Sequence, residues 1–177
     1  MQSALLNGAN IFLAGDNYNN LILIKTLLGD SGYTTFETFS NGNELLFHLE
    51  KQKPDLVIAD ICMQQVDGFQ LLREFKSHGD PAVGSTPVIL YSATFNDFET
   101  RRLANELGAE AFFTIPFDAK DFAAAVEKAI ARRLHTASAP APDGAGTEKI
   151  KLAILEDDKF SSRFLLQIGR ASCRERV

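Results

Sequence analysis

The fold of this chain is decided by the stretch Pro54-Asp-Leu-Val-Ile-Ala-Asp60-Ile-Cys-Met-Gln-Gln-Val-Asp67-Gly68. Its apolar run, Leu56–Ala59, is short and does not alternate with polar residues, which is typical of a strand buried on both faces of a sheet. The run ends at a carboxylate, Asp60, and an Asp-Gly pair follows seven residues later. We therefore expect Asp60 at the end of a buried strand, followed by a loop and a helix.

Similar short apolar runs alternate with amphipathic segments along the rest of the domain. The five predicted strands are Ile11–Ala14, Thr35–Thr38, Leu56–Ala59, Val88–Tyr91 and Ala111–Thr114. The five predicted helices are Tyr18–Leu28, Gly42–Glu50 (with Ser40 as its N-cap), Gly68–Lys76, Asn96–Leu107 and Ala119–Leu134. Because each strand is followed by a helix, the pattern predicts a parallel sheet covered on both faces. We expect one α/β domain over residues 10–134, with a flavodoxin-like, doubly wound, five-stranded parallel sheet.

Acidic and hydroxyl residues follow three of these strands. Asp16 comes after the first strand, Asp60 after the third and Ser92 after the fourth. In a doubly wound sheet the ligand site lies at the carboxyl ends of the strands, so these side chains are candidates for one site. Carboxylates gathered there repel each other and favour a hard divalent cation such as Mg²⁺. A carboxylate beside that cation can act as a nucleophile toward phosphorus.

These residues resemble the receiver domains of bacterial two-component response regulators, which share the fold of the chemotaxis receiver. The resemblance implies that Asp60 accepts a phosphoryl group from a histidine kinase or a phosphotransfer protein. It implies that Asp16, Asp60 and the backbone carbonyl of Cys62 hold Mg²⁺. It also implies that Ser92 hydrogen-bonds the phosphoryl oxygens and that Phe112 is the aromatic switch residue. On this reading the domain is a switch in a phosphorelay and not an enzyme.

Three residues depart from the family pattern. Gly15 stands where the family has the first of two acidic residues, so Mg²⁺ affinity is expected to fall. Ile115 stands before Pro116, where the family has a lysine that pairs with the phosphoacceptor. Gln64 replaces a common proline. These departures favour an alternative, a pseudo-receiver that keeps the fold as a protein-interaction module with weak or absent phosphorylation.

Two other readings are less well supported by the residues. A phosphatase of the haloacid-dehalogenase type also uses an aspartate at a strand end, but it needs a second Asp two residues later for acid–base work. Cys62 occupies that position here. His48 could be considered for phosphotransfer, but its place on a predicted helix favours a structural role.

Composition and charge indicate which broad class of protein this is and which kinds of partner are unexpected. Apolar residues make up 45% and charged residues 23% of the chain, which is globular composition. No apolar run approaches the ~20 residues of a membrane span, so we expect a cytoplasmic protein. The net charge of −5 argues against a nucleic-acid surface on this fragment. Contacts with another receiver or with an output domain remain open.

The sequence changes character after residue 134. Residues 135–148 are rich in Pro, Ala and Gly and are expected to form a flexible linker. The segment Ala153–Phe160 repeats the pattern of Ile11–Tyr18, a strand followed by acidic residues, here the pair Asp157 and Asp158. We interpret residues 149–167 as the truncated start of a second receiver domain. Residues 168–177 break the helical pattern and resemble translated sequencing adapter, so we interpret them as a cloning or sequencing artefact.

Overall fold

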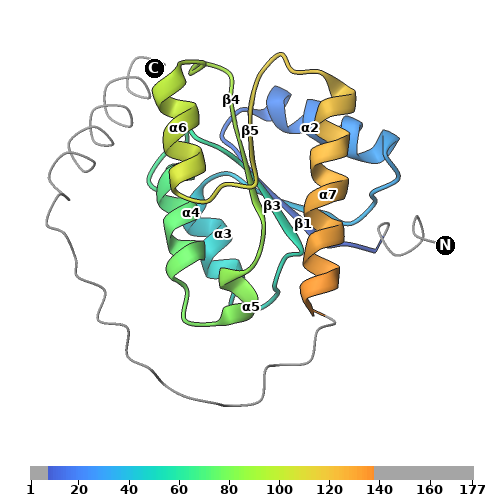
Figure 1. The fold of residues 1–177 in the computed structure, drawn as a ribbon, viewed down its shortest axis with the longest axis vertical. Helices are drawn as coiled ribbons and strands as arrows, with labels where there is room; N and C mark the ends of the chain where they lie inside the picture. Colours follow the sequence, from blue (N-terminus) through green and yellow to red (C-terminus); the bar gives the residue numbers. More distant parts are fainter. Residues whose placement is uncertain (1–7, 138–177) are drawn as a thin grey trace, which may run out of the picture. The chain divides into compact units, whose positions relative to one another are not determined.

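The structure is a computed structural model, and it describes residues 8–137 of the 177-residue chain (Figure 1). Five strands form one parallel sheet in the order β2-β1-β3-β4-β5. They are β1 (Ile11–Ala14), β2 (Phe36–Phe39), β3 (Leu56–Asp60), β4 (Val88–Ser92) and β5 (Ala111–Thr114). The strand order reverses at β1, so the carboxyl ends of β1 and β3 border the point where sheets of this kind bind ligands. The predicted doubly wound fold is confirmed.

Helices cover both faces of the sheet. The described helices are α2 (Tyr18–Asp30), α3 (Gly42–His48), α4 (Gly68–Ser77), α5 (Pro81–Gly84), α6 (Phe98–Glu106) and α7 (Ala119–Ala137). Figure 1 shows α2 and α7 on one face, with α3, α4 and α6 on the other. Right-handed crossovers between parallel strands require this arrangement on both faces.

The three central strands are buried along their whole length, which explains their unbroken apolar sequence. Side chains alternate between the two faces along each strand. One set packs with α2 and α7 into what we call the α2/α7 core. Its members include Ile11, Leu13, Ile24, Leu28, Leu56, Ile58, Ile89, Tyr91, Phe122, Val126, Ala129 and Ile130. The same alternation places Gly15, Asp60 and Tyr91 on this side of the sheet.

Several local details differ from the sequence prediction: β2 begins one residue later than predicted, and α3 and α6 are shorter. Asn41, and not Ser40, caps α3, because the Asn41 side chain accepts a hydrogen bond from the third residue of the helix. Helix α5 was missed, although Asp80 before a proline is a helix-start signal. Helix α7 ends at Ala137, three residues beyond the predicted end.

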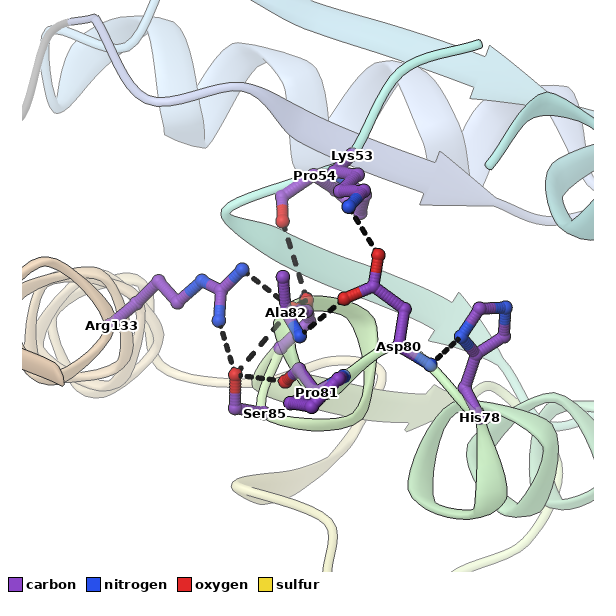
Figure 2. Close-up of polar contacts among 9 residues, drawn as sticks. Lys53, Pro54, His78, Asp80, Pro81, Ala82, Ser85 and Arg133 are labelled. Carbon is purple, nitrogen blue, oxygen red and sulfur yellow. Dashed lines mark hydrogen bonds and ion pairs between the residues drawn. The ribbon is translucent and has the colours of Figure 1, made fainter. Parts of the chain in front are cut away.

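A polar network ties the helices together at the amino ends of β3 and β4 (Figure 2). Arg133 of α7 donates to the Ala82 carbonyl of α5 and to the hydroxyl of Ser85. Lys53, just before β3, pairs with Asp80, the N-cap of α5. This network lies at the edge of the sheet opposite the carboxyl ends of the strands. Its groups are engaged with one another, so it serves as structural support.

Several sequence predictions fall on residues that the structure does not describe. They are the linker beyond residue 137, the start of a second domain with Asp157 and Asp158, and the interpretation of residues 168–177 as a cloning or sequencing artefact. These predictions lie outside the described residues.

Candidate functional site

Asp60 is the last residue of β3, at the carboxyl edge of the sheet. Asp60 is 4% exposed, and its Oδ1 accepts a hydrogen bond from the Cys62 backbone N–H at 2.9 Å. Such a bond to the backbone two residues on is the usual way an aspartate orders the turn that follows it. The carboxylate is therefore oriented by its own loop before any ligand arrives.

The helix after this loop begins directly against Asp60. Asp67 caps α4 by accepting a hydrogen bond from the Gln70 N–H at 2.8 Å, and Gln70 reaches back to complete a capping box. A Cβ on Gly68 would lie 2.5 Å from the Asp60 carbonyl oxygen and 2.9 Å from Ile61 Cα. Because these are backbone atoms, only glycine allows the helix to approach so closely. The Asp-Gly pair is thus explained by the structure: Asp67 caps the helix, and Gly68 avoids a clash with the backbone of Asp60 and Ile61.

Ser92 ends β4, one residue beyond Tyr91, which is the register partner of Asp60 on the neighbouring strand. Ser92 is fully buried, and its Oγ accepts hydrogen bonds from the backbone N–H groups of Thr94 and Phe95 at 3.1 and 2.8 Å. A serine hydroxyl that accepts two bonds still has its own proton to donate. The loop after β4 therefore holds Ser92 as a donor at the edge of the sheet that carries Asp60.

Phe112, the predicted switch residue, lies half-buried on β5. The guanidinium of Arg101 lies 5.4 Å from the centre of the Phe112 ring, within cation–π range. Arg101 also donates to Thr114 Oγ1 at 2.9 Å and to Asn96 Oδ1 at 2.7 Å. Sequence reasoning missed Arg101, because nothing in the spacing between α6 and β5 shows that they pair through this side chain.

Asp16 follows Gly15 beyond the end of β1 and is exposed. Burial raises the pKa of the Tyr91 hydroxyl above its ordinary value, and the negative charges of Asp60 and then Asp16 raise it further. Both carboxylates therefore act on one hydroxyl near the carboxyl edge of the sheet. The register pairs Ala14 with Ala59, which puts Gly15 level with Asp60 and Asp16 one residue further along the chain.

The donor atoms fit Mg²⁺. Two carboxylates, Asp16 and Asp60, and the carbonyl of Cys62 are hard oxygen donors, the kind that this ion prefers. Within residues 8–137 no three Asp, Glu, His or Cys side chains cluster as a metal site. Mg²⁺ commonly binds through one or two carboxylates and keeps several waters, so two carboxylates suffice for weak binding.

Gly15 and Ile115, the two main departures from the family pattern, both border the α2/α7 core. A Cβ on Gly15 would lie 2.5 Å from the Tyr91 Oη, so a tyrosine hydroxyl occupies the space beside this glycine. Ile115 packs against the same core, which includes Tyr91. Sequence reasoning missed Tyr91 because it read Gly15 as a simple loss of a carboxylate.

His48 has the structural role expected of it. Its ring packs against Phe12 and Phe39, with ring centres 5.6 and 5.3 Å away. Its Nε2 lies 2.8 Å from Glu37 Oε2. These contacts tie α3 to β1 and β2, away from Asp60.

Comparison with known proteins decides the family. A family model described as the response regulator receiver domain matches residues 11–127, well over half of the chain. The chain belongs to this family. The prediction of a receiver domain of two-component systems is thereby confirmed. Receiver domains act as phosphoryl-accepting switch modules rather than as ordinary enzymes.

Individual relatives of this receiver domain agree with that assignment. Sporulation initiation phosphotransferase F of Bacillus subtilis is 28% identical over 118 residues, which cover 67% of this chain and 90% of the relative. Response regulator Rre1 of Synechocystis is 33% identical over 129 residues, covering 73% of this chain and 52% of the relative. The chain thus spans most of the first relative and about half of the second.

Solved structures show the same fold. The signal receiver domain of a signal transduction histidine kinase from Syntrophus aciditrophicus matches with a TM-score of 0.63 and 27% identity, covering 78% of this chain and all of that one. A receiver domain protein from Clostridium thermocellum matches with a TM-score of 0.62 and 29% identity, covering 72% and 98%. Within residues 8–137, no helix of this receiver domain has the length and apolar character needed to cross a membrane.

Proposed function

We propose that this receiver domain accepts a phosphoryl group on Asp60 from a phosphohistidine of a histidine kinase or phosphotransfer protein. The observation that supports this most is the position of Asp60 at the end of β3, with Oδ1 oriented by the Cys62 N–H at 2.9 Å. The B. subtilis relative is itself named a phosphotransferase. A carboxylate held in one orientation is prepared for attack on phosphorus.

In this transfer a carboxylate oxygen of Asp60 forms a bond to phosphorus while the bond from phosphorus to the histidine nitrogen breaks. The imidazole that leaves keeps the electron pair and takes up a proton. Asp16, Asp60 and the Cys62 carbonyl would hold Mg²⁺, which supplies neutralisation of charge on the transferred group when bound. The hydroxyl of Ser92 would donate a hydrogen bond to a phosphoryl oxygen.

Phosphorylation would then change the partner surface through Ser92 and Phe112. The Ser92 carbonyl accepts a hydrogen bond from the Ile115 N–H at 2.8 Å, so a shift of the β4 loop reaches β5 directly. Phe112 lies on β5 against Arg101. A rearrangement there would alter the contacts that another receiver or an output domain makes with this face.

The test is phosphorylation with a small donor. The purified protein with Mg²⁺ and acetyl phosphate should gain the mass of one phosphoryl group, and Asp60→Asn should not. Asp67→Asn is the matched control, because it removes a neighbouring carboxylate while asparagine still caps α4. Labelling that persists in Asp60→Asn would contradict the assignment of this residue.

The second candidate is the pseudo-receiver, favoured by the apolar packing of Ile115 and by Gly15. It keeps the fold and the partner surface without phosphate chemistry. A folded parent that gains no label at high Mg²⁺, and that binds no beryllofluoride, would support this candidate.

The sequence after the described residues supports a further proposal about domain organisation. We propose that residues 149–167 begin a second receiver domain, in which Asp157 and Asp158 are the acidic pair after its first strand. The support is the repeat of the Ile11–Tyr18 pattern at an offset of 142 residues. The coding sequence beyond residue 167 tests this, because a second receiver requires another strand-end aspartate, which the same offset of 142 residues from Asp60 places at position 202.

A further inference from the structure

The hydroxyl of Tyr91 is a buried polar group without a hydrogen-bond partner among the described residues. The residue is fully buried, and its ring packs in the α2/α7 core. Buried tyrosine hydroxyls usually find a partner, and one that has none requires an explanation. Phenylalanine would fill a purely apolar position without this cost. The hydroxyl therefore suggests a partner that this protein binds.

The position of the hydroxyl shows where such a partner would lie. Tyr91 belongs to β4 and Gly15 follows β1, and β3 lies between these two strands. Tyr91 Oη nevertheless lies 2.5 Å from the point that a Cβ on Gly15 would occupy. The phenol thus crosses the end of β3, where Asp60 pairs in register with Tyr91. The absence of a side chain on Gly15 is what makes room for it.

The charges around the hydroxyl identify the chemistry of the partner. Asp60 and Asp16 are the two charges that act on Tyr91. Carboxylates at the same edge of a sheet favour a divalent cation such as Mg²⁺. Tyr91 Oη lies beside Gly15, the residue before Asp16, and Tyr91 pairs in register with Asp60, so this oxygen is placed to contact that cation or one of its waters.

We propose that Tyr91 Oη is an oxygen contact of the divalent cation at this site, either directly or through one of its bound waters. The inference rests on the proposed function and extends it. A neutral hydroxyl supplies the oxygen at the place where the family has a carboxylate, so the pair Gly15 and Tyr91 replaces an acidic side chain. The site keeps a full set of oxygen contacts with one negative charge fewer, and its Mg²⁺ affinity is reduced without being abolished.

The experiment uses the tyrosines as probes, because the sequence has three tyrosines and no tryptophan. Mg²⁺ alone is titrated into the full chain and followed by calorimetry and by tyrosine difference absorbance. We expect saturable binding with a tyrosine signal that Tyr18→Phe and Tyr33→Phe retain and Tyr91→Phe loses. We also expect Mg²⁺ affinity to fall about tenfold in Tyr91→Phe, the size typical of residues that support a metal site.

The outcomes separate this inference from the proposed function. Equal Mg²⁺ affinity in the parent and in Tyr91→Phe, or no Mg²⁺ binding by the folded parent, would overturn the role of Tyr91. Binding that depends on Tyr91, in a protein that acetyl phosphate never labels at Asp60, would support the inference and refute the proposed function. Should Tyr91→Phe fail to fold, the difference spectrum of a Tyr18→Phe/Tyr33→Phe variant decides, because Tyr91 is then its one tyrosine.

Discussion

The close approach of Tyr91 to Gly15 predicts a steric coupling that can be measured as stability. A Cβ on Gly15 would lie 2.5 Å from Tyr91 Oη, about 0.9 Å inside the 3.4 Å at which ordinary contact begins. The tyrosine is fully buried, so its ring cannot turn into solvent to relieve the clash. Overpacking of this kind costs about 1–3 kcal/mol. Alanine in place of glycine recovers roughly 0.4–1 kcal/mol by restricting the unfolded chain. We therefore expect Gly15→Ala to lower the free energy of unfolding by about 1–2 kcal/mol.

The same substitution should be harmless when the hydroxyl is absent. In a Tyr91→Phe background, the atoms nearest to the new Cβ are Leu21 Cδ2 at 3.4 Å and Leu21 Cγ at 3.6 Å, which are ordinary contacts. Gly15→Ala should then be neutral or slightly stabilising. Tyr91→Phe alone should be neutral or stabilising without Mg²⁺, because it removes a buried hydroxyl that has no partner among the described residues. The two substitutions should therefore be coupled by about 1.5–3 kcal/mol.

Urea unfolding followed by far-ultraviolet circular dichroism measures all four members of this cycle. Gly29→Ala is the control, since Gly29 lies in helix α2 and a Cβ there meets nothing within 4 Å. This control should stabilise the protein by up to ~1 kcal/mol. Equal destabilisation by Gly15→Ala in the tyrosine and phenylalanine backgrounds would refute the steric argument. The cycle also implies that an aspartate at Gly15 requires a smaller residue at position 91.

Three further predictions concern the surroundings of the site. Gly68→Ala should lower the free energy of unfolding by about 2–3 kcal/mol, because its Cβ meets backbone atoms that cannot move aside. The same substitution should slow the labelling of Asp60 by acetyl phosphate. Asp97→Ala should lower the free energy of unfolding at pH 7 by about 1 kcal/mol, because Asp97 is the N-cap of α6. Chemical denaturation measures this loss. The pKa of Asp97 is lowered by hydrogen bonds from the Thr100 hydroxyl and backbone N–H, so its contribution is complete above the unfolded pKa of about 4. The difference in free energy of unfolding between the parent and Asp97→Ala should therefore shrink as the pH falls below about 4. It should be lost once the pH is below the lowered pKa of Asp97 in the folded protein. Ile115→Lys should raise the rate of Asp60 labelling several-fold by bringing a cation to the site, whereas Ile115→Met should leave the rate unchanged.

Most of the fold could be predicted because each strand and most helices have a pattern of apolar residues within their own segment of the sequence. Strands buried on both faces must be apolar throughout, so β1, β3 and β4 were found within one residue of their ends. The more exposed edge strand β2 was placed one residue too early, because its pattern is weaker. Helix α5 was missed because four residues are too few to show a helical period.

The residues that lie at the carboxyl edge of the sheet could be predicted without the structure. In a parallel sheet every strand points the same way, so Asp16, Asp60 and Ser92 had to gather there once the strands were recognised. The group that fills the space beside Gly15, the Tyr91 hydroxyl, could be found only from the three-dimensional structure. Tyr91 reaches that glycine from a strand two positions away in the sheet, and such a contact depends on strand order, register and the path of one side chain. None of these leaves a periodic pattern in the sequence. A residue that the sequence shows only as part of a buried strand is therefore, in the folded domain, a neighbour of Gly15 and Asp60.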